Sequence, residues 1–575
     1  MSLLGILGII ASIASIIGVI PYVIKFFKWL SEKNDKRRGF FQNSLENNIL
    51  LAIYILEAKT DKKIAEKVNV LTKHVYEESY EDQEILKELP KLMKKKLIKT
   101  HNNDSEYRLT DPKGIKRATK IIARNWDSIR SAAKNKRSHE ILDRVELMKF
   151  ILEKAPEEIR SNRLSDIISY LQKKYQTVIW KTEVNHRSTG VPFQIIRETG
   201  NQDLTTELIK GHINKNELEI DENVITYYQE QEKDPKKNIH DGTVFRVYDY
   251  SENLELPLKL LTSDDCGYFE FQATCGVIRN EIEHKIVIKD DDAFNLPYRQ
   301  NVMHSNTRRH DVIKKYLKKR VLKTGIETST ILVKKNDSGM FANPRIPIIF
   351  RNNSVAEYPN FTMTIPSGAY QPGIDKKNKE NIPEQEIAKR VDWKFSLIRE
   401  LGEELFNLDK LDEANIKDIK TPAFKITEQI CNESILCKAQ AFGIDLYIGS
   451  GGILVTLVLD QDKVTKTLRN YQKHDEYHAT AKHMLDFFET LLKGGNVSWK
   501  EGQVKLFNFD KNYLNAISIP YNLNKETEPI RIPDISGNRP TIEPMIPSGV
   551  ISSFYAMDAL KKIDNIHPDV IKNIF

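Results

Sequence analysis

Cysteine is scarce in this chain. Its 575 residues include only Cys266, Cys275, Cys431 and Cys437, and no two of them form a CxxC pair. Four cysteines are too few for a disulfide framework, and a zinc site usually needs cysteines at close, paired spacing. The sequence therefore predicts neither a disulfide-stapled protein nor a zinc-binding one.

Charge is missing from the first 24 residues, where Leu, Ile and Val dominate. About 20 apolar residues suffice for a helix to cross the ~30 Å hydrocarbon core of a bilayer. The first positive charges, Lys25 and Lys28, follow this stretch, whereas a cleaved signal peptide has its basic region before the apolar run. The order favours an uncleaved transmembrane anchor over residues 1–30, single-pass in the inner membrane, with a cytoplasmic C-terminal body.

The predicted anchor carries a stripe of small residues at helical spacing: Gly5, Gly8, Ser12 and Ser15. Small residues let membrane helices approach closely, so this stripe predicts self-association of the anchor and a homo-oligomer. Residues 1–140 also carry a net positive charge, which suits contact with anionic membrane lipids.

Residues 43–122 have the pattern of a winged-helix-like module. Helical stretches precede two short strand-like segments, 97–100 and 107–110, on either side of a polar turn. Its lysines could contact the phosphates of DNA: they are Lys91, Lys94, Lys95 and Lys96. Winged helices also serve as protein-interaction modules. Since the anchor would hold this one close to a bilayer, nucleic acid is not the expected partner.

Residues 123–320 form a helical and β-rich middle region. Apolar and polar residues alternate between Thr243 and Asp290 in the manner of strands. This stretch predicts either a small β-domain or an extension of the sheet that follows it.

Two segments further on carry the strongest functional pattern. Residues 366–373 read Pro-Ser-Gly-Ala-Tyr-Gln-Pro-Gly, and residues 399–404 read Arg-Glu-Leu-Gly-Glu-Glu. On a helix, Glu400, Glu403 and Glu404 share one face and offer hard oxygen ligands to Mg²⁺. The glycines of the first segment, Gly368 and Gly373, allow the backbone to approach a ligand closely.

Together these segments resemble the two halves of a Nudix box. The resemblance implies an α/β/α domain, here with a C-terminal extension over 325–575, that handles nucleotide diphosphates with Mg²⁺. Arg351 stands where the family has an arginine at the end of a strand. We therefore assign the metal to Glu400, Glu403 and Glu404. The ligand is assigned to residues of the turn and to two arginines: Gly368, Tyr370, Gln371, Gly373, Arg351 and Arg399.

The chain departs from the Nudix pattern at three points. Ile374 replaces a glutamate, a lysine-rich insertion follows the first half of the box, and Phe406 replaces a glycine. These changes favour binding over hydrolysis, so no catalytic residue is assigned.

The overall prediction is an α+β multidomain protein whose layout resembles the transmembrane–Nudix effectors of CBASS anti-phage signalling. That resemblance implies a receptor for a nucleotide second messenger, in particular a cyclic oligonucleotide. Two alternatives remain open: a membrane-tethered, Mg²⁺-dependent Nudix hydrolase and a membrane-tethered transcription regulator.

Overall fold

The computed structural model divides the chain into two compact units. Unit 1 comprises residues 1–164 and 284–294, and unit 2 comprises residues 165–283 and 295–575. The described residues are 45–55, 60–62, 64–65, 68–69, 80–101, 106–110, 117, 157–184, 187–209, 217–233, 241–279, 282, 310–351, 361–372, 383–408, 419–495, 497–499, 502–523, 532–538 and 544–574.

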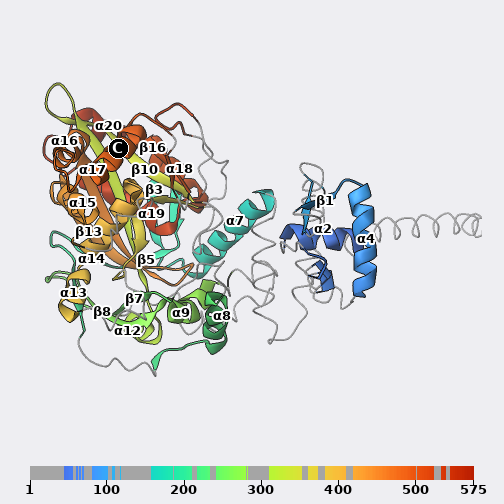
Figure 1. Cartoon of the computed structure of the whole chain (residues 1–575). Coiled ribbons are helices and arrows are strands. Elements are labelled where there is room, and N and C mark those ends of the chain that lie inside the picture. Colours follow the sequence, from blue (N-terminus) through green and yellow to red (C-terminus); the bar gives the residue numbers. More distant parts are fainter. Residues whose placement is uncertain are drawn as a thin grey trace, which may run out of the picture. The chain divides into compact units, whose positions relative to one another are not determined.

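The described part of unit 1 includes helices α2 (Leu45–Ile55) and α4 (Asp82–Lys94) and a hairpin of β1 (Ile98–His101) and β2 (Glu106–Leu109) (Figure 1). Helix α4 forms because apolar residues recur every three or four positions, and Ile85, Leu89 and Leu92 are buried. It continues through Pro90, and its chain then turns into β1, which pairs antiparallel with β2. Whether this unit acts as a winged-helix module stays a prediction.

Unit 2 is built on a nine-stranded sheet. Seven strands follow the order β15-β16-β10-β9-β14-β13-β5, while β11 pairs with β10 and β12 pairs with β9. The strands are β5 (Phe193–Glu198), β9 (Thr324–Lys335), β10 (Phe341–Arg351), β11 (Thr362–Thr364), β12 (Ser367–Ala369), β13 (Leu436–Asp445), β14 (Gly451–Asp460), β15 (Val497–Trp499) and β16 (Gly502–Asn508).

The centre of the sheet is the parallel pair β9 and β14. The sequence of β14, Gly-Gly-Ile-Leu-Val-Thr-Leu-Val-Leu-Asp, is almost continuously apolar, and nine of its ten residues are buried. Strands covered on both faces have this composition, because neither face meets water. Helices must therefore lie on both sides of β14.

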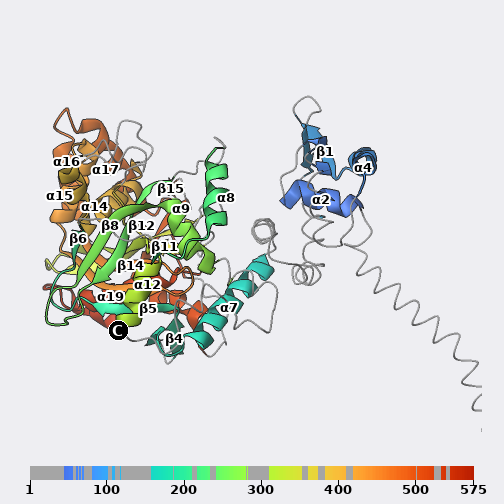
Figure 2. The same cartoon turned by 90° about the horizontal axis from the view of Figure 1, so that it is seen from below.

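Two of these helices cover opposite faces. They are α14 (Trp393–Glu400) and α19 (Pro547–Leu560), and Figure 2 shows the sheet between them. Gly368 of β12 pairs with Ile326 of β9, and the Glu400 carboxylate covers the face on which a Gly368 side chain would stand. On the other face, the Ser329 hydroxyl lies 3.4 Å from that of Ser553 in α19. Since residues three apart on a strand point to opposite faces, unit 2 has helix, sheet and helix layers.

Further helices complete the layers. They are α7 (Glu157–Lys174), α8 (Glu222–Glu232), α9 (Tyr268–Phe271), η3 (Gln272–Gly276), α12 (His310–Lys319), α13 (Glu384–Arg390), η5 (Leu401–Leu405), α15 (Pro422–Asn432), α16 (Gln461–Tyr471), α17 (His478–Leu492), α18 (Lys511–Ser518), η7 (Ile519–Tyr521) and α20 (Pro568–Ile574). Helices α14 to α17 pack on one another as a group.

Most of the middle region, residues 165–283 and 295–320, belongs to unit 2, whereas residues 123–164 and 284–294 are assigned to unit 1. Strand β5 pairs antiparallel with β13 and so completes the main sheet. A second sheet has the order β6-β8-β7, from β6 (Thr205–Leu208), β7 (Thr243–Tyr250) and β8 (Lys259–Gly267). A hairpin of β3 (Trp180–Val184) and β4 (Arg187–Val191) lies separately. The sequence left open whether the strands between Thr243 and Asp290 extend the main sheet. Strands β7 and β8 instead form this second, three-stranded sheet.

Buried Arg246 joins the second sheet to α12. Its guanidinium donates to the backbone carbonyls of Leu317, Lys318 and Arg320, at distances of 3.2, 2.6 and 3.1 Å. These carbonyls end a helix, where the backbone dipoles favour positive charge. The contact ties β7 to the helix that leads into β9.

The fold is α+β, as predicted. The prediction of a membrane-spanning helix, with a single-pass arrangement in the inner membrane, is contradicted. Within the described part of the chain, no helix combines the length and the apolar character needed to cross a bilayer. The expected anchor over 1–30, with Gly5, Gly8, Ser12 and Ser15, lies outside the described residues.

Candidate functional site

The two motif segments meet beside β9, where Gly368 of the first lies against Glu400 of the second. Strand β12 carries Gly368, and the Glu400 carboxylate occupies the space next to its α-carbon. An added β-carbon at Gly368 would overlap that carboxylate, well inside van der Waals contact. Position 368 therefore requires glycine because the Glu400 side chain approaches its backbone closely. The sequence had predicted that a ligand would make this approach.

The motif helix changes its geometry within the acidic segment. Asp392 caps α14 by accepting a hydrogen bond from the Lys394 backbone N–H at 2.9 Å. After Glu400 the chain continues as η5, one π-helical turn over Leu401–Leu405. Such π-turns widen the helix and alter which side chains share a face. Glu403 and Glu404 both lie in this turn. The three glutamates therefore do not share the single helix face that an α-helix would give them.

Arg399 lies among the carboxylates. Its guanidinium is 3.2 Å from both oxygens of Glu403, is ion-paired with Glu400, and donates to the Ala369 carbonyl at 3.2 Å. Burial of Arg399 opposes its charge, but the attraction of Glu400 and Glu403 outweighs burial and raises the Arg399 pKa. Arg399 therefore neutralises the acidic residues from within the protein.

Glu404 and Glu327 complete the cluster around Ser367. The Ser367 backbone N–H donates to Glu404 at 2.7 Å, and its hydroxyl donates to Glu327 on β9. We call Glu327, Arg399, Glu400, Glu403 and Glu404 the acidic cluster. It sets four carboxylates against one guanidinium.

As arranged, the acidic cluster does not fit a Mg²⁺ ion. In the described ranges, no three His, Cys, Asp or Glu side chains come together in a way that could hold a metal. Glu400 and Glu403 are directed to Arg399, and Glu404 is directed to a backbone N–H. Each carboxylate that the sequence assigned to metal thus has a partner within the protein.

The predicted ligand residues Tyr370 and Gln371 differ in burial. Tyr370 is fully buried, its ring packs in a tilted arrangement against Phe245 with the ring centroids 4.8 Å apart, and its hydroxyl donates to the Val391 carbonyl. Gln371 is partly exposed, and its backbone N–H and carbonyl both contact the Ser396 hydroxyl, at 3.4 and 3.3 Å. In this arrangement Tyr370 presents no ring face to a ligand.

Arg351 and Gly373 complete the predicted set. Arg351 ends β10, where its guanidinium lies 2.9 Å from the Met363 sulfur. Gly373 lies outside the described residues.

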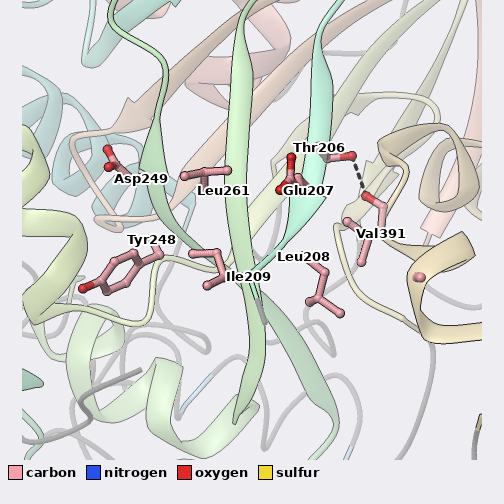
Figure 3. A pocket seen from close by; sticks show the side chains of 9 residues that line it. Thr206, Glu207, Leu208, Ile209, Tyr248, Asp249, Leu261 and Val391 are labelled. Atoms are coloured by element: carbon pink, nitrogen blue, oxygen red, sulfur yellow. Dashed lines mark hydrogen bonds between the residues drawn. The ribbon is translucent and has the colours of Figure 1, made fainter. Parts of the chain in front are cut away.

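A cavity of about 670 Å³ opens beside this motif, on the second sheet. Its wall is formed by Thr206, Glu207, Leu208, Ile209, Tyr248, Asp249, Leu261, Ala388 and Val391. Figure 3 shows Tyr248 and Asp249 on β7, Leu261 on β8, and Val391 facing them from beyond the outer edge of β6. Ligand pockets for small molecules fall between roughly 300 and 1,000 Å³, so this cavity has room for one.

Val391 connects the cavity with the motif, and the Trp393 backbone N–H of α14 also donates to the Thr206 hydroxyl at 3.3 Å. The Val391 carbonyl accepts hydrogen bonds from Thr206, in the cavity wall, at 2.6 Å and from Tyr370 of the glycine turn. Val391 immediately precedes Asp392, the N-cap of α14. Displacement of the cavity wall would therefore reach both the turn and the motif helix.

Sequence reasoning did not assign the cavity residues. The alternation from Val244 to Tyr248 indicates a strand, but nothing in it indicates that Tyr248 would face open space. That information depends on how β6 and the 388–391 segment approach each other.

Two of the four lysines that the sequence offered for DNA contact are paired with carboxylates in the described part of unit 1. Lys91 pairs with Glu88 at 2.7 Å, and Lys95 pairs with Glu46 of α2. Helix α4, which carries Lys91, also exposes Leu86 and Met93. Partly neutralised lysines beside exposed apolar side chains suit a protein surface better than the phosphate backbone of DNA.

Comparison of the chain with protein-family models, with curated proteins and with solved structures gives no match.

Proposed function

We propose that this chain is a receptor that binds a nucleotide without hydrolysing it. The ligand class is a nucleotide second messenger, and a cyclic oligonucleotide is the first to test. The Nudix resemblance supports a nucleotide, and the three departures from the Nudix pattern support binding over hydrolysis.

The observation that carries the proposal is the position of Arg399. A Nudix-type hydrolase needs its carboxylates to hold Mg²⁺, which in turn polarises the phosphates. Here the carboxylates of Glu400 and Glu403 are occupied by a guanidinium from their own helix. A buried, hydrogen-bonded ion pair is expensive to break, because it leaves charge without compensation.

The cavity is the proposed place of the ligand. Tyr248 is partly exposed there, and a base can stack on its ring. The Thr206 hydroxyl lies in the same wall. Lys318 lies 5.9 Å from the Tyr248 ring centroid and brings positive charge to the cavity, whereas Lys314 is paired with Asp249 at 3.2 Å and with Glu252 at 2.5 Å.

The ligand would act through Val391. A base or sugar that displaces Thr206 weakens its 2.6 Å hydrogen bond to the Val391 carbonyl. Since Val391 precedes the cap of α14, binding can shift the motif helix. A ligand moves such an equilibrium only by its different affinity for the two states.

The test is calorimetric titration of the purified chain with cyclic di- and trinucleotides, ATP and a dinucleoside polyphosphate, with chromatography to detect products. We expect binding of at least one cyclic oligonucleotide and no product with Mg²⁺ present. Tyr248→Ala should weaken binding roughly 5- to 150-fold, because stacking on an aromatic ring is worth about 1–3 kcal/mol. Tyr471→Ala is the matched control, since Tyr471 ends α16, whose packing neighbours are α15, α17, β9 and β14.

A second candidate, a Mg²⁺-dependent hydrolase, is favoured by the surplus of carboxylates in the acidic cluster. It predicts product formation that Glu403→Gln and Glu404→Gln abolish. Release of nucleoside monophosphate or phosphate with that dependence would replace the receptor proposal with this one.

A further inference from the structure

The four cysteines fall into two different environments. Cys266 and Cys275 are fully buried in one apolar cluster with Val244, Phe271 and Val321. Cys431 and Cys437 lie elsewhere, and their sulfur atoms are 3.8 Å apart. Cys437 is also partly exposed. Cys431 is buried beside it, so a small reagent can approach this second pair from the side of Cys437.

The second pair is held by a short, well-anchored turn. Cys431 lies in the last turn of α15, and Cys437 is the second residue of β13. Between them, the Glu433 carboxylate accepts hydrogen bonds from Gln429 at 2.6 Å and Thr467 at 2.8 Å. The Glu433 carbonyl accepts a further bond from Lys463 at 3.0 Å. The sulfurs are therefore neighbours in an ordered part of the chain.

The two thiols differ in acidity. The hydrogen bond from Cys437, with help from nearby Lys394, outweighs burial and lowers the Cys431 pKa. The same hydrogen bond, with burial, raises the Cys437 pKa. By contrast, burial raises the pKa of Cys275 to about 11. Because the thiolate is the reactive form, Cys431 is the nucleophile of the pair and Cys275 is inert.

We propose that Cys431 and Cys437 form a redox modification site, at which a hydroperoxide converts the two thiols into an intramolecular disulfide. The sulfurs must approach from 3.8 Å to about 2.05 Å, which side-chain rotation of two neighbouring cysteines can provide. This inference does not depend on the proposed nucleotide binding.

The chemistry balances in two steps. The Cys431 thiolate attacks one oxygen of hydrogen peroxide, so that an S–O bond forms and the O–O bond breaks. The departing hydroxide takes up a proton and leaves as water. The Cys437 sulfur then attacks the Cys431 sulfenic acid; the S–S bond forms, the S–O bond breaks, and the second hydroxide leaves as water with the Cys437 proton. Two thiols lose two electrons, and the peroxide becomes two waters.

The site also adjoins the motif helix. Lys394 in the first turn of α14 interacts with the Cys437 sulfur and with Asp203, whose carboxylate is 3.3 Å away. Phe395 of α14 stacks at 5.4 Å on Phe424 of α15, the helix that carries Cys431. Oxidation would remove the negative charge near Lys394 and alter the support of α14.

Protease mapping can test the pair directly. Trypsin cuts after Lys425 and Lys438, so both cysteines fall in one peptide, and cleavage after Glu433 separates them. The reduced full-length chain is treated with hydrogen peroxide, blocked with N-ethylmaleimide and digested. We expect peptide 426–438 to lose two hydrogen masses and its two fragments to stay linked after cleavage at Glu433. Cys266 and Cys275, in the same molecules, should remain free thiols.

Variants distinguish this step from general oxidation. Cys437→Ser should stop at the Cys431 sulfenic acid, which dimedone labels, and Cys431→Ser should give neither the disulfide nor comparable dimedone labelling. Maleimide-labelled Cys431 and Cys437 after peroxide treatment of the wild-type chain would overturn the proposal. Equal dimedone labelling of Cys431 in the wild-type chain and in Cys437→Ser would also overturn it, since Cys437 would then play no part.

Discussion

The acidic cluster and the cavity lie on either side of Val391, and they differ in nearly every physical property. The acidic cluster is densely charged, all its members except Glu327 are buried, and Arg399 and Ser367 contact its carboxylates from within the protein. The cavity has about 670 Å³ of space, an aromatic wall residue and mostly uncharged side chains. The motif that resembles a ligand site is filled by the protein itself, whereas the adjoining sheet offers the space.

This difference shows that the presence of ligand-binding groups and their accessibility to a ligand are separate properties. A motif identifies which chemical groups are present, but access depends on which neighbours reach them first. If the acidic cluster is structural and the cavity functional, substitutions in the cluster should lower stability, and substitutions in the cavity should lower binding.

The largest effect is expected from Arg399→Met. Removal of the guanidinium leaves Glu400 and Glu403 buried beside each other without it, and breaking a buried ion pair costs about 3–5 kcal/mol. Arg469 is the matched control, because it pairs with Glu489 at 3.0 Å but is 61% exposed. Arg469→Met should cost about 0–1 kcal/mol. Urea unfolding of both variants measures the difference, and equal losses would mean that the cluster is not structural.

A smaller loss is expected from Gly368→Ala. The added methyl group overlaps the Glu400 carboxylate, and overpacking a closed site costs roughly 1–3 kcal/mol. At Gly242 an added β-carbon meets nothing within 4 Å, so Gly242→Ala should leave the unfolding midpoint nearly unchanged. If both variants unfold alike, the close approach of β12 and α14 is absent in solution.

The smallest effect is expected from Tyr370→Phe. The Val391 carbonyl keeps its hydrogen bond from Thr206, so loss of the tyrosine hydroxyl should cost about 0.5–1.5 kcal/mol. Nucleotide affinity should stay within a factor of two or so, because Tyr370 is buried and does not line the cavity. Calorimetry and thermal unfolding on one sample can check both. A large drop in affinity at unchanged stability would return the glycine turn to the ligand site.

Part of the local structure could be predicted from the sequence, but the contacts of the candidate site residues could not. The strand-like segments predicted at 97–100 and 107–110 form the hairpin of β1 and β2, because alternation and turn residues decide such local features. The glutamates were predicted to share one α-helical face, but Glu403 and Glu404 lie in the π-helical turn η5, and Gly368, which was assigned to a ligand, faces Glu400 instead. Arg399 was predicted to bind a ligand, because a sequence does not indicate whether a guanidinium contacts a phosphate or the neighbouring carboxylates. Tyr370 was misplaced for the same reason: Phe245 and Val391, which bury it, are distant or separated by the insertion.

Strand β5 sets an order of events during synthesis. Phe193 pairs with Asp445, so β5 leaves the ribosome roughly 250 residues before its partner strand. At about 5–20 residues per second, that delay is roughly 12–50 s. Throughout it, a strand that carries Phe193, Ile195 and Ile196 and has no partner is open to association with other chains. The main sheet can close only after β13 and β16 have been synthesised, so the yield of native protein should depend on elongation rate and on chaperones that bind nascent chains.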